Sequence, residues 1–395
     1  MVRGGLAKAN SSDRSKVALM QDLGFRPPSI AECLAAESRQ AISRLKRGRR
    51  PEARFQLPAA VLNADPLISY SGMVPQAQLG LASIAEASMR ERGGWFLISP
   101  TWSIEKTTRA KMLRRHAVIH RRRNPHHELI FLCNTPEEVA LLREHGEAAF
   151  FLNKTLTVPE AIFRPIEGTP VEFDAIYNAQ LVRWKRHELS LGIERCAFLF
   201  YRGRTDATSR EVEAALIARH ARLAPGHAFL NSIDARGVPI RVPPAEVNRH
   251  LSRAAVGLCL SAEEGAMFAN TEYLLAGLPI VTTPSIGGRH IHLDPDYCLT
   301  VPPDPRSIAE AVAALKARRI PRGYVRERTL QRLERDRARF IDLLNQILAA
   351  SNAANRLSMP WPFRKAVTLE WLPPEVALRR AVSGKVDGFV ASAEG

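Results

Sequence analysis

The stretch SAEEGAMFANTEYLLAGLPIVTTPSIGG, residues 261–288, decides the fold class of this 395-residue chain. It follows a short apolar run, AVGLCL at residues 255–260, which predicts a buried strand. We expect a helix to open near Gly265 and to end at Gly277, because a glycine followed closely by Pro279 is a helix stop signal. PIVTTP then predicts a second buried strand. A strand, loop, helix and strand in this order indicate an α/β unit, whose helix N-terminus favours an anion such as a diphosphate.

Two acidic residues in this stretch, Glu264 and Glu272, lie eight positions apart. On a helix that opens near Gly265 they are expected about 80° apart around the axis and just over two turns apart along it. One carboxylate then lies at the mouth of a pocket and the other lies deeper. Taken singly, each glutamate is also explained by a favourable charge near a helix start or by an exposed helical position.

The spacing of these residues resembles the donor site of the GT-B family of retaining glycosyltransferases. That family carries Ser-x-x-Glu-Gly, a second Glu eight residues after the first, and then Ala, Gly, Pro and Val in that order. The residues of this chain that keep the pattern are Ser261, Glu264, Gly265, Glu272, Ala276, Gly277 and Pro279. The resemblance covers roughly residues 171–345, somewhat under half of the chain.

The segment upstream resembles the family's phosphate-binding segment in part. Lys185 occupies the position of a lysine that faces the donor diphosphate, five residues after an arginine. In this chain Gln180 stands at the arginine's position, and either Arg183 or Arg186 is a candidate substitute. A second departure is Trp102, which lies near the position where family members often place a histidine.

The resemblance implies a role for each of these side chains. The implied catalytic residues are Glu264, which orients the donor sugar through its hydroxyls, and Lys185, which stabilises the leaving diphosphate. Glu272 is implied to accept hydrogen bonds from the ribose hydroxyls. The other implied donor-binding residues are Gly265, Ala266, Met267, Asn270, Thr271, Gln180 and Arg186. By this resemblance, transfer retains the anomeric configuration and needs no metal and no cofactor beyond the nucleotide-sugar co-substrate.

The expected fold class is α/β, with two Rossmann-like domains that face a central cleft and a helical C-terminal tail. The N-terminal half contains the buried-strand patterns WFLISP, ELIFLCN and AAFFLN, and the helix pattern NTPEEVALLREHG with Asn134 or Thr135 as its cap. We assign residues 1–166 to an acceptor-side domain, 167–345 to the donor-binding domain and 346–395 to a tail that returns to the first domain. Roughly the first 90 residues, which include a Pro-punctuated stretch, give no fold prediction.

The chain is strongly basic, with 56 Lys and Arg against 40 Asp and Glu and a net charge of +16. Basic residues gather in KTTRAKMLRRHAVIHRRRNPHH, residues 106–127. We expect this segment to form an unbalanced positive surface that contacts lipid headgroups or an anionic glycan, although a solvated helix face is the common alternative. Nucleic acid is a less favoured partner, because no RNA-binding motif or zinc-finger spacing accompanies the charge.

Cysteine usage and hydropathy bear on location. Five cysteines occur singly and without a C-x-x-C pair, which predicts reduced thiols and no metal site. No apolar run approaches the roughly 20 residues of a membrane span, and the first thirty residues lack the apolar core of a secretory signal. We therefore expect a cytoplasmic protein that contacts the inner membrane face peripherally.

The function expected from the resemblance is transfer of a sugar from a nucleotide sugar to a glycan or a lipid-linked precursor, in polysaccharide biosynthesis. The alternative is a GT-B-like protein that has lost transfer and serves as a binding or scaffold module, which the departures at Gln180 and Trp102 would explain. A nucleic-acid-binding protein would explain the net charge and leave residues 261–288 unexplained. Among enzymes, the runner-up is an epimerase or a phosphorylase on the same scaffold.

Overall fold

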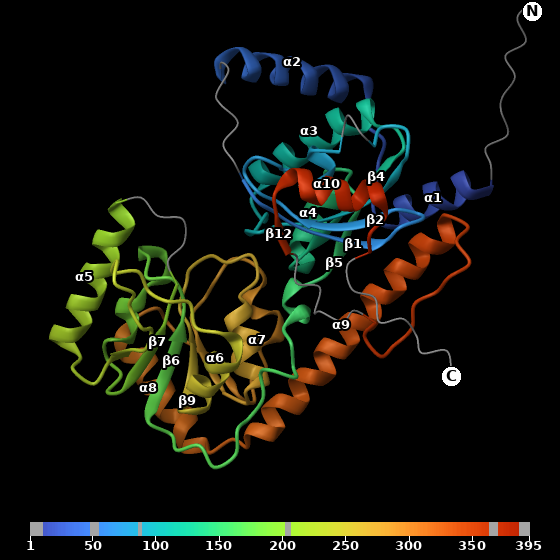
Figure 1. Ribbon diagram of the computed structural model, residues 1–395. Helices are drawn as coiled ribbons and strands as arrows, with labels where there is room; N and C mark the ends of the chain where they lie inside the picture. Colours follow the sequence, from blue (N-terminus) through green and yellow to red (C-terminus); the bar gives the residue numbers. More distant parts are fainter. Residues whose placement is uncertain (1–10, 48–54, 86–88, 202–206, 363–369, 387–395) are drawn as a thin grey trace, which may run out of the picture. The chain divides into compact units, whose positions relative to one another are not determined.

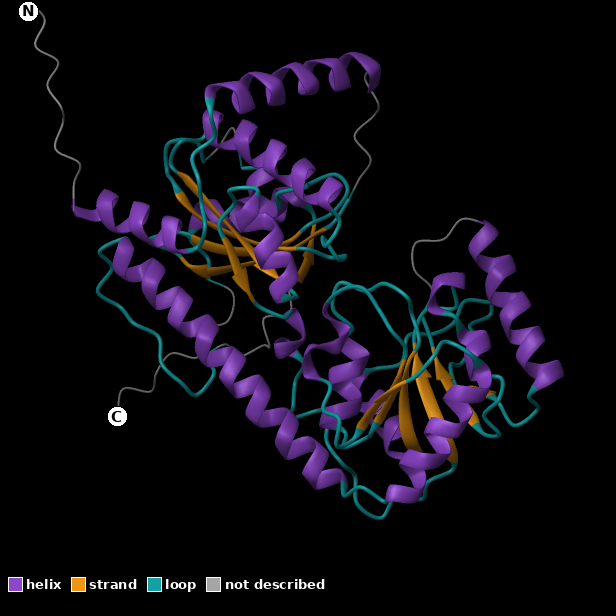
Figure 2. Cartoon of the chain, turned by 180° about the vertical axis from the view of Figure 1, so that it is seen from behind, coloured by secondary structure: helices purple, strands orange, loops and turns teal. Residues whose placement is uncertain are grey.

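The computed structural model describes residues 11–47, 55–85, 89–201, 207–362 and 370–386 (Figure 1). The chain folds into two compact units: unit 1 comprises Met1–Lys154 with Asp336–Gly395, and unit 2 comprises Thr155–Arg335. Each unit contains a six-stranded sheet, and helices pack against both sheets (Figure 2). The expected α/β class with two Rossmann-like units is therefore confirmed.

The sheet of unit 1 has the strand order β12-β1-β2-β3-β4-β5. Its strands are β1 (Leu57–Asn63), β2 (Ile68–Gly72), β3 (Gly94–Ser99), β4 (His127–Cys133), β5 (Ala149–Phe151) and β12 (Glu370–Leu372). From β2 to β5 the neighbouring strands are parallel, whereas β1 pairs antiparallel with both β2 and β12. The three buried-strand patterns of the N-terminal half are β3, β4 and β5, and the C-terminal tail pairs with unit 1 through β12.

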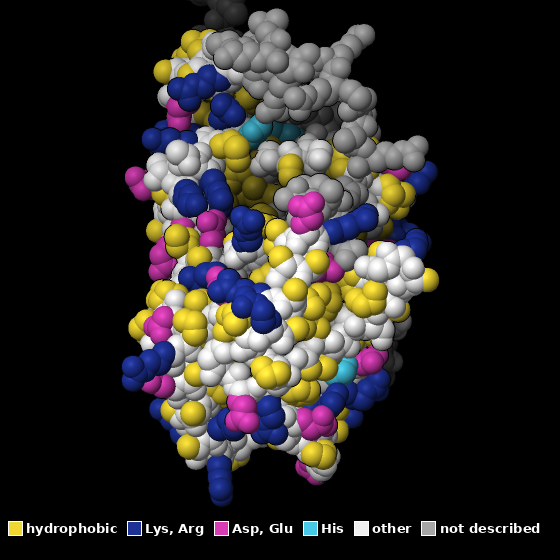
Figure 3. Space-filling model, turned by 90° about the vertical axis from the view of Figure 1, so that its left-hand side faces the viewer, with side chains coloured by type: hydrophobic (Ala, Val, Ile, Leu, Met, Phe, Trp, Pro, Cys, Tyr) yellow, Lys and Arg dark blue, Asp and Glu magenta, His cyan; other side chains and the backbone are white. Residues whose placement is uncertain are grey.

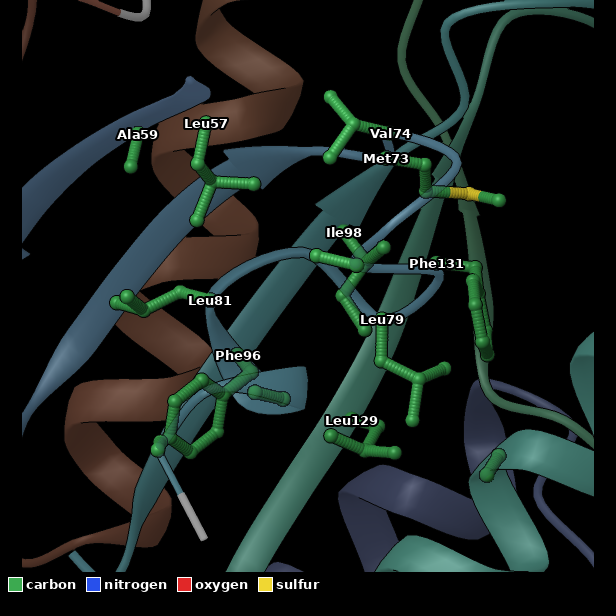
Figure 4. Close-up of a cluster of buried hydrophobic side chains, with 14 of the residues drawn as sticks. Leu57, Ala59, Met73, Val74, Leu79, Leu81, Phe96, Ile98, Leu129 and Phe131 are labelled. Atoms are coloured by element: carbon green, nitrogen blue, oxygen red, sulfur yellow. The ribbon is translucent and has the colours of Figure 1, made fainter. Parts of the chain in front are cut away.

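The helices of unit 1 are α1 (Ser11–Asp22), α2 (Ile30–Arg47), α3 (Thr107–Arg123), α4 (Pro136–Glu144) and α10 (Pro374–Ser383). α4 begins where the sequence predicts, because the Thr135 hydroxyl caps it and accepts a hydrogen bond from the Glu138 N–H at 3.1 Å. Apolar side chains of β1, β3 and β4 form the core, and the tail adds Leu372 from β12 and Ala377 from α10. Figure 4 shows part of this core, including Leu57, Phe96, Ile98, Leu129 and Phe131.

The sheet of unit 2 has the order β11-β10-β9-β6-β7-β8, and all of its paired strands are parallel. Its strands are β6 (Phe173–Asn178), β7 (Cys196–Leu199), β8 (Ala228–Phe229), β9 (Ala254–Cys259), β10 (Ile280–Thr282) and β11 (Cys298–Thr300). The chain starts in the middle of the sheet at β6, builds outward to β8, and then returns to β9 to build the other half. This is the doubly wound order that dinucleotide-binding sheets use.

The helices of unit 2 are α5 (Ala207–Leu223), α6 (Pro244–Ser252), α7 (Phe268–Leu275) and α8 (Pro305–Arg318), and α9 (Arg322–Ala350) begins in unit 2 and ends in unit 1. α7 ends as predicted, because Gly277 takes a φ of 79° that other residues rarely adopt. Asp304 caps α8 by accepting a hydrogen bond from the Ser307 N–H at 2.8 Å. None of the helices in the described ranges has both the length and the apolar character needed to cross a membrane.

The division between the units lies about ten residues earlier than the expected boundaries at 166/167 and 345/346. Residues 155–166 belong to unit 2 because they bond to its helices. The Arg326 guanidinium of α9 donates to the carbonyls of Glu160 and Phe163 at 2.9 and 2.5 Å. These bonds fasten the segment that enters unit 2 to the helix that leaves it.

Candidate active site

The sheet of unit 2 reverses its strand order between β6 and β9. β6 leads to β7 and β8 on one side, and β9 leads to β10 and β11 on the other. The connections that leave the carboxyl ends of β6 and β9 therefore diverge, and in open parallel sheets ligands bind in the crevice that such a reversal creates. The main candidate residues follow these two strands, with Lys185 after β6 and both Glu264 and Glu272 after β9.

The loop after β9 contains Glu264, which does not lie on a helix as the sequence suggested. α7 begins at Phe268 rather than near Gly265. The preceding segment pairs instead with the loop after β10: the Glu264 N–H donates to the Ile286 carbonyl, and the Ile286 N–H donates to the Ala262 carbonyl, both at 3.0 Å. This bridge keeps the segment extended, so the predicted placement of both glutamates on one helix is wrong.

Lys185 and Glu264 form an ion pair, in which Lys185 Nζ donates to Glu264 Oε1. Lys185 ends the short 3₁₀ helix η3 (Arg183–Lys185), and the Tyr177 hydroxyl holds its position by donating to the Lys185 carbonyl at 2.8 Å. Ser261 Oγ donates to the same Glu264 oxygen at 2.5 Å. The two residues that the resemblance assigned to catalysis are thus in direct contact, although they come from opposite sides of the strand-order reversal.

Two arginines contact the same loops. Arg289, in the 3₁₀ helix η5 (Gly288–His292), donates from Nη1 to the Ser261 carbonyl at 2.7 Å and from Nη2 to the Thr283 carbonyl. Arg186 donates from Nε to the Leu260 carbonyl at 2.6 Å and from Nη2 to Thr283 Oγ1 at 2.7 Å. Two donor nitrogens of Arg186 are therefore bonded to protein. The sequence analysis missed Arg289, for which the preceding glycine pair was the only local signal.

Glu272 lies in α7 beside the end of β6. Its Oε2 accepts a hydrogen bond from Asn178 Nδ2 at 3.1 Å, and burial raises its pKa to about 7. The adjacent Tyr273 hydroxyl accepts a hydrogen bond from the Asn178 N–H at 2.5 Å. Asn178 therefore docks α7 on β6 and orients Glu272. It was also missed, although a polar residue at the carboxyl end of a buried strand is a recognisable signal.

The first turn of α7 and the two residues before it provide donors and acceptors that have no partner within the described residues. Among the described residues, the N–H groups of Ala266 and Met267 find no protein acceptor. Asn270 and Thr271 are buried, and neither Asn270 Oδ1 nor Thr271 Oγ1 has a hydrogen-bond partner within the part of the chain that is described. Gln180 lies half-buried after β6, so its side chain borders the same end of the sheet.

The basic segment at 106–127 was expected to form an unbalanced positive surface, and that expectation stays a prediction. It forms α3, and α2 packs along this helix (Figure 1). Three of its arginines are ion-paired, Arg114 and Arg121 with Glu147 and Arg122 with Glu37. The face in Figure 3 shows Lys and Arg side chains interspersed with Asp and Glu. These three arginines therefore have carboxylate partners within unit 1.

The crevice is chemically suited to an anion that also carries hydroxyl groups. Lys185 and the open N–H groups of Ala266 and Met267 are donors of the kind that bind phosphate. Glu264 and Glu272 are acceptors for hydroxyl groups. In the described ranges, no group of three or more His, Cys, Asp or Glu side chains is arranged to hold a metal ion.

No family model matches the chain, and neither does any curated protein. Among solved structures, it is similar to sucrose-phosphate synthase from Thermosynechococcus elongatus, with 17% identity and a TM-score of 0.48 over 64% of this chain and 68% of that one. It is similar to HepE from Anabaena in complex with UDP, with 11% identity and a TM-score of 0.40 over 65% of this chain and 83% of that one. A glycosyltransferase from Rickettsia africae shows 10% identity and a TM-score of 0.45 over 69% and 82% of the two chains. At these identities the similarity concerns the fold alone and says nothing of the residues in the crevice.

Proposed function

We propose that the chain is a retaining glycosyltransferase that moves a sugar from a nucleotide-sugar donor to a glycan or lipid-linked acceptor, without a metal ion. The observation that carries the proposal is the Lys185–Glu264 ion pair at the strand-order reversal, beside the open N–H groups of Ala266 and Met267. A cation and a helix N-terminus together suit a diphosphate. A carboxylate that can exchange its lysine for hydroxyl groups suits a sugar.

Each residue then has a role in binding and in the departure of the leaving group. Lys185 pairs with the donor diphosphate, while Glu264 accepts hydrogen bonds from the donor sugar. Glu272, oriented by Asn178, accepts hydrogen bonds from the ribose hydroxyls. As the bond from the anomeric carbon to the phosphate oxygen breaks, negative charge grows on the diphosphate. Lys185 and the N-terminus of α7 stabilise that charge where it develops.

Retention follows if the acceptor attacks the face from which the diphosphate leaves. The acceptor oxygen forms the new bond to the anomeric carbon, and the electron pair of the broken bond goes to the phosphate oxygen. The acceptor's proton passes to that same oxygen, so no side-chain base is required. We assign acceptor binding mainly to unit 1.

Sugar transfer by the intact protein tests the proposal. Radiolabelled UDP-glucose, GDP-mannose and ADP-glucose are each offered with a cell-envelope lipid extract, in the presence of EDTA. We expect transfer from one donor with retention, and a loss of about 100-fold in Glu264→Gln, because the carboxylate that orients the donor sugar is removed. Glu310→Gln, on the exposed face of α8, is the control that keeps activity. A wild type that binds a nucleotide sugar and transfers none would instead support a scaffold protein.

A further inference from the structure

Arg289 combines nearly complete burial with hydrogen-bond partners that carry no charge. Its side chain is 1% exposed. The guanidinium donates to the Ser261 carbonyl and hydroxyl at 2.7 and 3.3 Å and to the Thr283 carbonyl. Within the described residues no carboxylate lies at ion-pair distance from it. A buried cation is costly unless an anion compensates its charge, so this arginine requires an explanation.

Ser261 connects Arg289 to the candidate catalytic carboxylate. Its hydroxyl accepts a hydrogen bond from Arg289 Nη1 and donates its own proton to Glu264 Oε1 at 2.5 Å. The hydroxyl is therefore polarised toward Glu264 and cannot rotate without losing both bonds. Asn270 adds a second fixed point, because its Nδ2 donates to the Arg289 carbonyl at 2.5 Å. Arg289 thus ties the loop after β10 to the loop that carries Glu264.

The charges of this network are not balanced. Lys185 is paired with Glu264, whereas Arg186, like Arg289, donates to a carbonyl and a hydroxyl. Glu272 is bonded to Asn178 rather than to either arginine. Three cations therefore lie near the carboxyl end of β9, and among the described residues only Lys185 of the three is bonded to a carboxylate. A ligand with more than one negative charge would complete the balance.

We propose that Arg289 is a positioning residue of the donor site, which fixes the Glu264 carboxylate through Ser261 and whose buried charge is compensated by the phosphates of a bound nucleoside diphosphate. This inference rests on the proposed function. Arg289 does not touch the donor, because its side chain is covered by the loops that it joins. It acts through the Ser261 hydroxyl and through its field, which is screened less in a buried site than in water.

The first part of the test needs no ligand. Melting temperatures are compared for Arg289→Met, Glu264→Gln and the double variant. We expect the losses to be non-additive, because each single change already breaks the shared network. The matched control is Arg322→Met: Arg322 donates to the Ser252 and Ala254 carbonyls at the opposite, amino end of β9. The decrease in melting temperature for Arg322→Met should add to the decrease for Glu264→Gln. Additive decreases for Arg289→Met and Glu264→Gln would overturn the proposal.

The second part measures affinities by calorimetry for UDP, GDP, ADP and the corresponding nucleosides. For the diphosphate that the wild type binds, Arg289→Met should lower the affinity about tenfold, which corresponds to about 1.4 kcal/mol. The affinity for the nucleoside and the affinities of Arg322→Met should not change. If Arg289→Met affects nucleoside and diphosphate equally, Arg289 is only structural and the proposal is wrong.

The proposal can also be tested if Arg289→Met does not fold or if the wild type binds no diphosphate. Should Arg289→Met not fold, Ser261→Ala removes the linking hydroxyl with less disturbance, and it should lower diphosphate affinity several-fold while sparing the nucleoside. If the melting temperatures are coupled but the wild type binds no diphosphate, the positioning of Glu264 is supported and the proposed function is refuted.

Discussion

The two sheets of this chain differ in how their strands are ordered. In unit 1 the parallel strands β2, β3, β4 and β5 follow one another across the sheet, so each connection steps in the same direction. In unit 2 the order reverses between β6 and β9. Lys185, Glu264 and Glu272 all follow the strands at this reversal. The strand order therefore places these three residues after two adjacent strands of the sheet.

Two buried carboxylates, one in each unit, differ in the kind of group that donates hydrogen bonds to them. In unit 1 both oxygens of Glu138 accept backbone N–H groups, from Ile104 and Asn134, each at 2.8 Å. In unit 2 the partners of Glu264 are the side chains of Lys185 and Ser261. A backbone donor is fixed by the fold, whereas a lysine can turn to a ligand. Glu138 thus contributes to stability, whereas we propose that Glu264 exchanges its lysine for a ligand.

The largest difference is expected between two lysines. Lys185→Met should lower nucleoside diphosphate affinity about 10- to 100-fold, because a charge-assisted hydrogen bond contributes about 1.5–3 kcal/mol. Lys154 of unit 1 donates to the carbonyls of Pro100 and Thr101 at 3.0 and 3.3 Å, so Lys154→Met should leave that affinity unchanged. Calorimetric titration of both variants checks this. Equal losses would mean that the crevice is not the anion site.

For stability, the larger effect is expected in unit 1, where Glu138 is compared with Glu272 of unit 2. Glu138→Ala leaves two buried backbone N–H groups without acceptors, and the free energy of unfolding should fall by about 1–3 kcal/mol. Glu272→Ala loses one bond to the Asn178 side chain and should cost less than about 1 kcal/mol. Urea unfolding of the two variants provides the comparison. A larger loss for Glu272→Ala would show that this carboxylate has a mainly structural role.

The pH dependence separates the same two residues by function. Burial raises the pKa of both Glu138 and Glu272 from 4.5 to about 7. Because each folded pKa exceeds the unfolded value, each contributes stability below about pH 4.5 that is lost as pH rises through 7. In the proposed site, ribose hydroxyls donate to the ionised form of Glu272, so diphosphate affinity should rise several-fold from pH 6 to pH 8. Glu272→Gln should flatten this rise and Glu138→Gln should not; a rise that survives in Glu272→Gln must have another origin.

The last prediction concerns a feature that the units share. His120 Nε2 contacts His127 Nδ1 at 3.0 Å in unit 1, and His220 Nδ1 contacts His227 Nδ1 at 2.8 Å in unit 2. Burial lowers the pKa of His120 to about 3 and that of His220 to about 4. Stability present above about pH 6.5 is therefore lost as pH falls toward these values, by up to about 1 kcal/mol per pH unit for each group. Urea unfolding of the wild type should show the free energy of unfolding falling from pH 7 to pH 5. His120→Gln and His220→Gln should each remove part of this fall, by similar amounts. A pH slope that is unchanged in both variants would contradict this.

Elements with local signals were predictable from the sequence. α4 and α8 begin at residues whose side chains cap them, Thr135 and Asp304, and α7 ends at Gly277. The strands β9 and β10 are short apolar runs bounded by loop residues. Lys185, Glu264 and Glu272 could be predicted because they match a family motif whose residues lie at fixed intervals along the sequence. None of these predictions requires knowledge of which segments pair.

Features that depend on distant pairing were not predictable. β1 contains Pro58, which argues against a strand, and the structure tolerates it because Pro58 pairs with Trp371 of β12 and lies beyond the end of the pairing with β2. Glu264 leaves the expected helix because Ile286 bridges to its backbone. Asn178 and Arg289 acquire their roles only when the loops after β6, β9 and β10 meet.

The most direct measurement is a thermal-shift comparison of the intact protein with UDP, GDP and ADP, for the wild type and Glu272→Ala. A ligand that binds only the folded state at a hundredfold excess over Kd stabilises it by about 2.7 kcal/mol. We predict that one diphosphate raises the melting temperature of the wild type and that the shift is largely lost in Glu272→Ala. No shift with any of the three, or an equal shift in both proteins, would contradict a nucleotide-sugar site at the carboxyl end of this sheet.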